Sequence, residues 1–181
     1  MLKKIKNKYI LIDTNILIYS SRSPNEFKPF FNKIRKYKIS PAIDYSIKLE
    51  FLRSSNTLKA FNYKKDYLDL FFGDKKNHMI IPTEKKIFEN AMQLSILYNF
   101  LNVPKRTKIS PIDCLIAGQL MKYKEKLALA TINNSDFPLE IFNRLEIFNI
   151  ELSHDILNIG IYQFSGIKYQ KAYNKFVAKS E

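Results

Sequence analysis

Short apolar segments of strand length alternate along this chain with longer segments of helical periodicity. The clearest strand-like runs are residues 9–12 and 127–131, and we also expect strands at residues 39–43, 79–81 and 146–150. Between these runs, apolar positions recur mostly at the spacing of one helix face. Strands that alternate with helices favour a parallel sheet with helices packed on its faces. The sequence therefore predicts an α/β fold with a mainly parallel central sheet.

The net charge of +13 narrows the choice of partner. It indicates binding to a polyanion, although a genome rich in A and T would also give a chain rich in lysine and asparagine. The 181 residues fit one domain with a sizeable core, and the single cysteine, Cys114, excludes an internal disulfide. No signal-peptide pattern opens the chain, and no apolar stretch reaches the length of a membrane span. We therefore expect a cytoplasmic protein without a membrane partner.

Four acidic residues, Asp13, Glu50, Asp113 and Asp136, each lie at the edge of an apolar segment. Each has an ordinary structural explanation: a helix cap, a solvent-facing helix position, a first-turn acid and a turn former, respectively. Only Asp13 favours function by itself, because Thr14 can cap the helix that follows. Carboxylates that converge repel one another, and a divalent cation usually compensates them. Sites in parallel sheets form beyond the carboxyl ends of strands, where Asp13 and Asp136 are predicted to lie.

Taken together, the four segments resemble the PIN-domain family of metal-dependent nucleases, and most closely its VapC-type branch of bacterial and archaeal toxins. The matching positions are Asp13-Thr14-Asn15, then Ser46 and Glu50, then Asp113 with Ile116-Ala117, and finally Thr131, Asn133, Asp136 and Phe137. Each motif is short, but the four occur in order over about residues 9 to 150. The order and spacing make the resemblance more specific than any one motif.

The resemblance implies a three-layer α/β/α fold with the acids in one pocket, Mg²⁺ or Mn²⁺ as the cofactor, and RNA as the substrate of an endoribonuclease. In this reading Asp13 and Asp113 are the principal metal ligands, Glu50 is a ligand or orients the attacking water, and Asp136 completes the site. The residues expected to contact these ligands or the phosphate are Thr14, Asn15, Thr131 and Asn133. Mg²⁺ prefers oxygen ligands and keeps waters, one of which can serve as the nucleophile.

The chain is longer than the toxins it resembles. We predict a nuclease domain over residues 1–152 and a basic, helical carboxyl-terminal extension over residues 153–181, packed on the same domain. The resemblance implies a small cognate antitoxin and a homodimer as partners, with residues 61–72 and 162–176 as the apolar candidates for such contacts.

Two alternatives stay open. One is an RNA-processing nuclease without an antitoxin, and the other is an RNA-binding or interaction module with a PIN-like fold and little or no cleavage. The basic segments at residues 33–38 and 105–108 are expected either to contact RNA phosphates near the site or to form solvated faces.

Overall fold

The computed structural model describes residues 8–72, 79–101, 109–153 and 155–179, and its centre is a six-stranded sheet in the order β3-β2-β1-β4-β6-β5. The strands are β1 (Tyr9–Ile12), β2 (Ser40–Asp44), β3 (Met79–Ile81), β4 (Leu127–Thr131), β5 (Phe142–Glu151) and β6 (Ile156–Phe164). The first four pair in parallel, whereas β6 runs antiparallel to both β4 and β5. The predicted α/β class and mainly parallel sheet are therefore confirmed.

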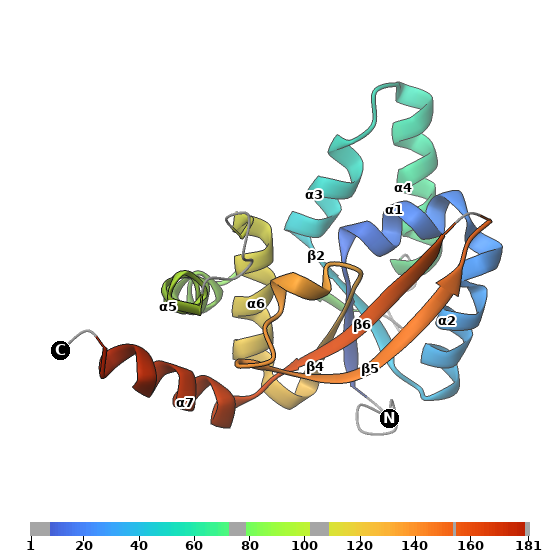
Figure 1. Ribbon diagram of the computed structural model, residues 1–181. Coiled ribbons are helices and arrows are strands. Elements are labelled where there is room, and N and C mark those ends of the chain that lie inside the picture. The colour runs from blue at the N-terminus through green and yellow to red at the C-terminus, as the bar shows by residue number, and fades with distance from the viewer. Residues whose placement is uncertain (1–7, 73–78, 102–108, 154, 180–181) are drawn as a thin grey trace.

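Helices cover both faces of the sheet, which gives three layers (Figure 1). The helices are α1 (Thr14–Arg22), α2 (Pro24–Lys36), α3 (Tyr45–Arg53), α4 (Leu58–Phe72), α5 (Lys85–Leu101), α6 (Pro111–Tyr123) and α7 (Gly166–Val177). In Figure 1, α5 and α6 lie to one side of the sheet, α1 and α2 lie to the other, and α3 and α4 project upward from it. No helix in the described ranges is long and apolar enough to cross a membrane.

The two central strands, β1 and β4, explain the clearest apolar runs of the sequence. Every residue of β4 is buried, as are the last three residues of β1. Burial of such side chains on both faces is typical of parallel strands with helices on each side. The two strands pair in register, with Ile12 opposite Ala130, so Asp13 lies next to the end of β4.

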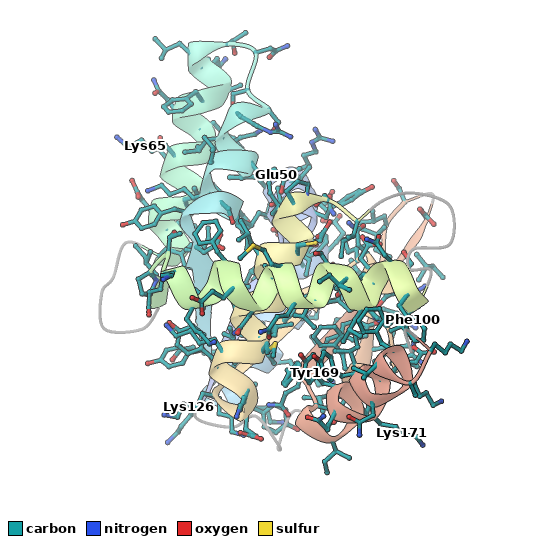
Figure 2. All side chains as sticks on the ribbon, turned by 90° about the vertical axis from the view of Figure 1, so that its left-hand side faces the viewer. Glu50, Lys65, Phe100, Lys126, Tyr169 and Lys171 are labelled. Carbon is teal, nitrogen blue, oxygen red and sulfur yellow. The ribbon has the colours of Figure 1, made fainter. Side chains whose placement is uncertain are left out.

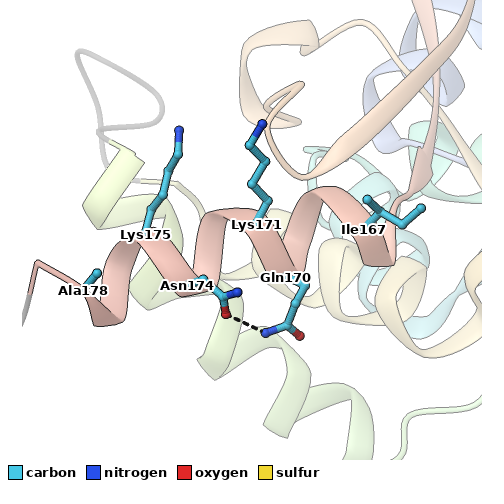
Figure 3. A pocket seen from close by; sticks show the side chains of 6 residues that line it. All are labelled: Ile167, Gln170, Lys171, Asn174, Lys175 and Ala178. Carbon is cyan, nitrogen blue, oxygen red and sulfur yellow. Dashed lines mark hydrogen bonds between the residues drawn. The ribbon is translucent and has the colours of Figure 1, made fainter.

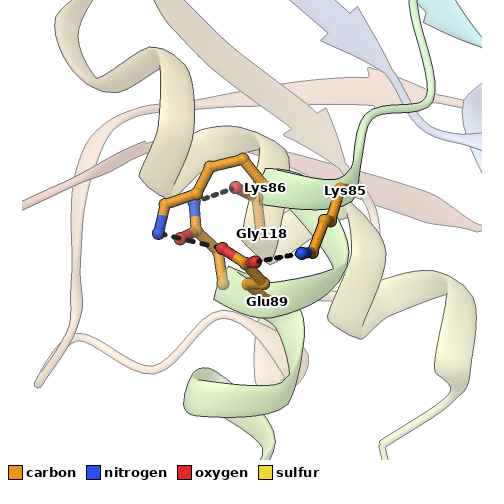
Figure 4. Close-up of polar contacts among 5 residues, drawn as sticks. Lys85, Lys86, Glu89 and Gly118 are labelled. Carbon is orange, nitrogen blue, oxygen red and sulfur yellow. Dashed lines mark hydrogen bonds and ion pairs between the residues drawn. The ribbon is translucent and has the colours of Figure 1, made fainter.

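Close packing of α5 against α6 holds the second face together (Figure 4). A Cβ atom placed on Gly118 of α6 would lie 2.5 Å from the carbonyl oxygen of Ile87 in α5, so only glycine permits this approach. The side chain of Asn90 donates a hydrogen bond of 3.2 Å to the carbonyl oxygen of Gly118. Because both elements are fixed here, α5 presents its last turns to the start of α6 in a defined position.

The predicted helical tail is only partly correct. Residues 166–177 form α7, but residues 156–164, which were expected to be helical, form β6. The strand fits the sequence ILNIGIYQF, which is rich in β-branched and aromatic residues, and its partners are β4 and β5 on either side. Tyr162 and Phe164 are buried. Residues beyond 152 therefore supply an internal strand of the sheet and not only an outer helical layer.

Candidate functional site

Asp13 follows β1 and is only 3% exposed. It occupies the N-cap position of α1, but its side chain makes no capping hydrogen bond there. Instead, its Oδ2 atom accepts a hydrogen bond of 2.6 Å from the hydroxyl of Thr131, at the end of β4. Thr131 is fully buried, and its hydroxyl oxygen also accepts a hydrogen bond from the backbone N–H of Asn133. The carboxylate is therefore held toward β4 and does not serve as an ordinary cap.

Glu50 lies on α3 and is half-buried. Its Oε2 atom accepts a hydrogen bond of 2.6 Å from the hydroxyl of Thr14 in the first turn of α1. Thr14 is itself buried, so this contact joins two helices at the edge of the sheet where β1 ends. The structure therefore does not support the solvent-facing alternative for Glu50. The neighbouring residue of α1, Asn15, is half-buried.

Asp113 lies in the first turn of α6, where Ser110 is the N-cap. The hydroxyl of Ser110 accepts a hydrogen bond from the backbone N–H of Asp113 and donates one of 2.5 Å to its Oδ2 atom. The first of these bonds is the N-cap half of a capping box, whereas the second joins the two side chains and does not return to the backbone N–H of Ser110. The structural and functional interpretations of Asp113 are compatible, since the cap fixes the direction of the carboxylate.

Asp136 lies in a short 3-10 helix, η3 (Asn134–Asp136), that follows β4. It is half-buried, and its Oδ1 atom accepts a hydrogen bond of 3.2 Å from the hydroxyl of Ser135. The backbone N–H of Asp136 donates to the carbonyl oxygen of Asn133, so the segment after β4 is a tight turn. This turn holds Asp136 a few residues beyond the carboxyl end of β4.

Charge interactions link these four residues, which we call the acidic cluster. The pKa of Asp13 rises from its ordinary 3.8 to about 6, mainly because of burial, with further increases from the charges of Asp113 and Glu50. The pKa of Asp113 is also raised, first by burial and then by Asp136 and Glu50. Burial raises the pKa of Asp136. No lysine or arginine in the described ranges contributes to these three shifts.

The donor set of the acidic cluster suits a hard divalent cation. Within the described ranges, no group of three or more histidine, cysteine, aspartate or glutamate side chains is arranged to hold a metal ion by itself. Mg²⁺ does not require such a cage, because it commonly uses one or two carboxylates together with waters and substrate phosphates. The carboxylates of Asp13 and Asp113 fit that role, since each is fixed by a hydroxyl donor and each has a raised pKa without a cation.

Two sequence interpretations need correction or completion. The hydroxyl of Ser46 donates a hydrogen bond of 2.8 Å to the buried carboxylate of Asp44, the N-cap of α3, and not to Glu50. The basic segment at residues 33–38 precedes β2, so it lies at the opposite edge of the sheet from Asp13, and Lys33 pairs with Glu146. It is therefore not a phosphate-binding segment near the site. The segment at residues 105–108 lies outside the described residues.

Sequence reasoning missed Tyr98, which lies on α5 and is fully buried. Its hydroxyl has no hydrogen-bond partner among the described residues. Burial raises its pKa well above the usual value of 10, and Cys114, Asp113 and Asp136 add to that rise. Its place in the sequence gave no sign of this, because an aromatic residue at helical spacing is usually a core residue.

The hollow found along α7 is unrelated to the acidic cluster (Figure 3). Its lining residues are Ile167, Gln170, Lys171, Asn174, Lys175 and Ala178. They form one outer face of the helix and include no carboxylate.

No protein-family model matches the chain, and no curated protein matches it at a significant level.

Proposed function

We propose that this protein is a metal-dependent endoribonuclease that hydrolyses RNA phosphodiester bonds at the acidic cluster. The observation that supports the proposal is the mutual electrostatic coupling of Asp13, Glu50, Asp113 and Asp136, which come from four separate segments of the chain. A purely structural set of caps and turns has no need to bring like charges together, because their repulsion costs free energy. A divalent cation compensates that cost and suits an all-oxygen donor set.

Asp13 and Asp113 would hold Mg²⁺ or Mn²⁺ in this proposal. When bound, the cation supplies an activated water and offsets the negative charge that develops on the phosphate. Thr131 and Ser110 fix the two carboxylates in direction before any ligand arrives. Glu50, steered by Thr14, is the residue we assign to orienting the attacking water or completing the coordination. Asp136 closes the cluster on the side of the turn that follows β4.

The projecting helices α3 and α4 support RNA as the substrate. Exposed basic side chains on this pair are Arg53, Lys59 and Lys65. Figure 2 labels Lys65 on α4 and Glu50 on α3 within the same projecting pair. Basic side chains on the helix pair that includes Glu50 can contact phosphates of a bound strand while the carboxylates hold the cation. The net charge of +13 agrees with a polyanionic substrate.

Cleavage of a labelled RNA pool tests the proposal directly. Full-length protein is incubated with RNA in Mg²⁺, in Mn²⁺ and with EDTA, alongside the Asp13→Asn and Asp113→Asn variants. We expect cleavage that requires the cation and is lost in both variants, because each substitution removes a metal ligand. Cleavage that continues in EDTA, or at the wild-type rate in either variant, would remove the acidic cluster from the mechanism.

The same assay separates this proposal from an RNA-binding module with little or no cleavage. Such a module would bind RNA in a filter-binding assay and leave the RNA intact in both cations. The like charges of the acidic cluster favour the nuclease, since a binding surface for RNA gains nothing from buried carboxylates that repel its phosphates.

The finer assignment, a cytoplasmic toxin held inactive by a cognate antitoxin, rests on the family resemblance. Exposed apolar side chains on α3 and α4 support a protein partner, and the largest exposed fractions are 75% for Leu58 and 80% for Leu70. Phe61 and Tyr63 on α4 are exposed as well. Expression in a bacterial host tests the toxin: we expect growth arrest by the wild type and none by Asp13→Asn. A processing nuclease without an antitoxin would permit growth.

A homodimer is the second partner we propose. Of the two segments expected to supply contacts, residues 162–176 contribute Tyr162 to the core, whereas α4 keeps apolar side chains on its surface. Light scattering on the wild type and on a Leu58→Glu, Leu70→Glu variant tests the surface of α4. We expect a dimer that the double substitution weakens. A monomer in both proteins at concentrations well above micromolar would contradict it.

A further inference from the structure

The hydroxyl of Tyr98 is a buried polar group that lacks a hydrogen-bond partner among the described residues. The side chain is 0% exposed, and among the described residues its hydroxyl has no hydrogen-bond partner. A buried hydroxyl without a partner costs free energy, and such groups are uncommon in folded proteins. By comparison, Tyr67 and Tyr162 each direct a hydroxyl to a partner, at Ser20 and Asn134. Tyr98 therefore calls for a ligand or an ordered water.

Two carboxylates of the acidic cluster act on the Tyr98 hydroxyl. The charges of Asp113 and Asp136 act on it, and α5 packs against α6, whose first turn contains Asp113. Ser110 contacts Asp113 and Ser135 contacts Asp136, but Tyr98 makes a hydrogen bond to neither carboxylate. The phenol therefore responds to both charges without a hydrogen bond to either carboxylate.

We propose that the hydroxyl of Tyr98 donates a hydrogen bond to a water molecule held between Asp113 and Asp136, in the hydration shell of a bound divalent cation. The identity of the cation rests on the proposed function. A phenol donates and two carboxylates accept, so a water at this place makes three hydrogen bonds, the number typical of buried waters. A phosphate oxygen fits less well, because it cannot donate to either carboxylate.

Tyr98 is therefore a positioning residue that fixes the hydration of the cation from the α5 side. Burial and the neighbouring carboxylates keep its pKa well above 10, so the hydroxyl remains protonated and able to donate at physiological pH. The close contact of Gly118 with Ile87 and the hydrogen bond from Asn90 hold α5 in place, so the donor does not have to be ordered when the ligand binds.

Tyr98→Phe removes only the hydroxyl. Tyr67→Phe is the matched control, because the Tyr67 hydroxyl donates a hydrogen bond of 2.8 Å to Ser20, which is not part of the acidic cluster. Each full-length variant is measured for melting temperature without metal, for Mn²⁺ affinity from the free-ion signal in electron paramagnetic resonance, and for kcat and KM of RNA cleavage. For Tyr98→Phe we expect an unchanged or higher melting temperature without metal, Mn²⁺ affinity lower by about tenfold or more, and a loss in kcat with little change in KM. For Tyr67→Phe we expect a melting temperature lower by about 2–4 °C with Mn²⁺ affinity and cleavage unchanged.

The outcomes separate the two proposals. If Tyr98→Phe binds Mn²⁺ with wild-type affinity, the proposed role of the hydroxyl is overturned. If the melting temperature of this variant also falls, the hydroxyl binds a structural water instead. Loss of kcat/KM with unchanged Mn²⁺ affinity overturns the cation-bound water in favour of a substrate oxygen. A wild type that binds no Mn²⁺ in the millimolar range overturns it as well. Reduced Mn²⁺ affinity in Tyr98→Phe, with no RNA cleavage by the wild type, supports Tyr98 and refutes the nuclease.

Discussion

Replacement of Asp13 by asparagine should stabilise the metal-free protein while abolishing its activity. The pKa of Asp13 rises from its ordinary 3.8 to about 6 on folding, with burial as the largest cause. At about 1.4 kcal/mol per pKa unit, ionisation of Asp13 costs the folded state about 3 kcal/mol, as an order of magnitude. Asparagine has a similar shape, carries no charge, and keeps an oxygen that can accept the hydrogen bond from Thr131.

The stability difference between Asp13→Asn and the wild type should depend on pH. Between pH 3.8 and about 6 the folded protein holds the proton of Asp13 more tightly than the unfolded chain does, so the contribution of this group to stability falls as the pH rises. The full penalty is present above pH 6 and absent well below pH 4. Asp13→Asn lacks the penalty at every pH, and its advantage over the wild type should therefore grow from pH 4 to pH 7.

Thermal unfolding in EDTA, followed by circular dichroism at several pH values from 4 to 7.5, measures the difference. A gain of about 3 kcal/mol in a chain of this size corresponds to roughly 6–12 °C in melting temperature. Asp66→Asn is the control, because Asp66 is exposed on α4. Equal or lower stability of Asp13→Asn at pH 7.5, or a difference that does not change with pH, would refute the assignment of Asp13 as a buried, destabilised carboxylate.

The remaining predictions concern the other ligand, the metal and the packing of the second face. Asp113→Asn should abolish RNA cleavage and leave the circular dichroism spectrum unchanged; a correctly folded variant with wild-type cleavage would contradict this. Calorimetry on metal-stripped protein should show no tight Mg²⁺ binding, since phosphates supply part of the coordination, and sub-micromolar affinity without RNA would contradict it. Gly118→Ala should lower the free energy of unfolding by about 1–3 kcal/mol, because its Cβ would lie 2.5 Å from the carbonyl oxygen of Ile87. Urea titration measures the loss, and a neutral result would show that α5 can move away. A chain cut near residue 154 should fail to give a cooperative unfolding transition, because β6 lies inside the sheet.

The sequence by itself determined the elements whose signals are local. The apolar runs of β1 and β4 are buried on both faces, and that burial is visible as an unbroken run of apolar residues. The parallel order also follows from alternating strands and helices, which place Asp13 and the turn with Asp136 at one edge of the sheet. Ser110 was predictable as a cap from its spacing to Asp113.

Only the tertiary structure decided the features that depend on packing between distant segments. Residues 156–164 were expected to be helical, and they form β6 because β4 and β5 offer hydrogen-bond partners on both sides. Glu50 is an ordinary helical glutamate in the sequence, and it joins the acidic cluster because α3 packs beside α1, where Thr14 donates to it. Tyr98 is a core aromatic by its spacing, and its hydroxyl lies near Asp113 because Gly118 lets α5 approach α6. A pattern along the chain reports which face of an element is buried, whereas convergence of side chains on one point depends on how the elements pack in three dimensions.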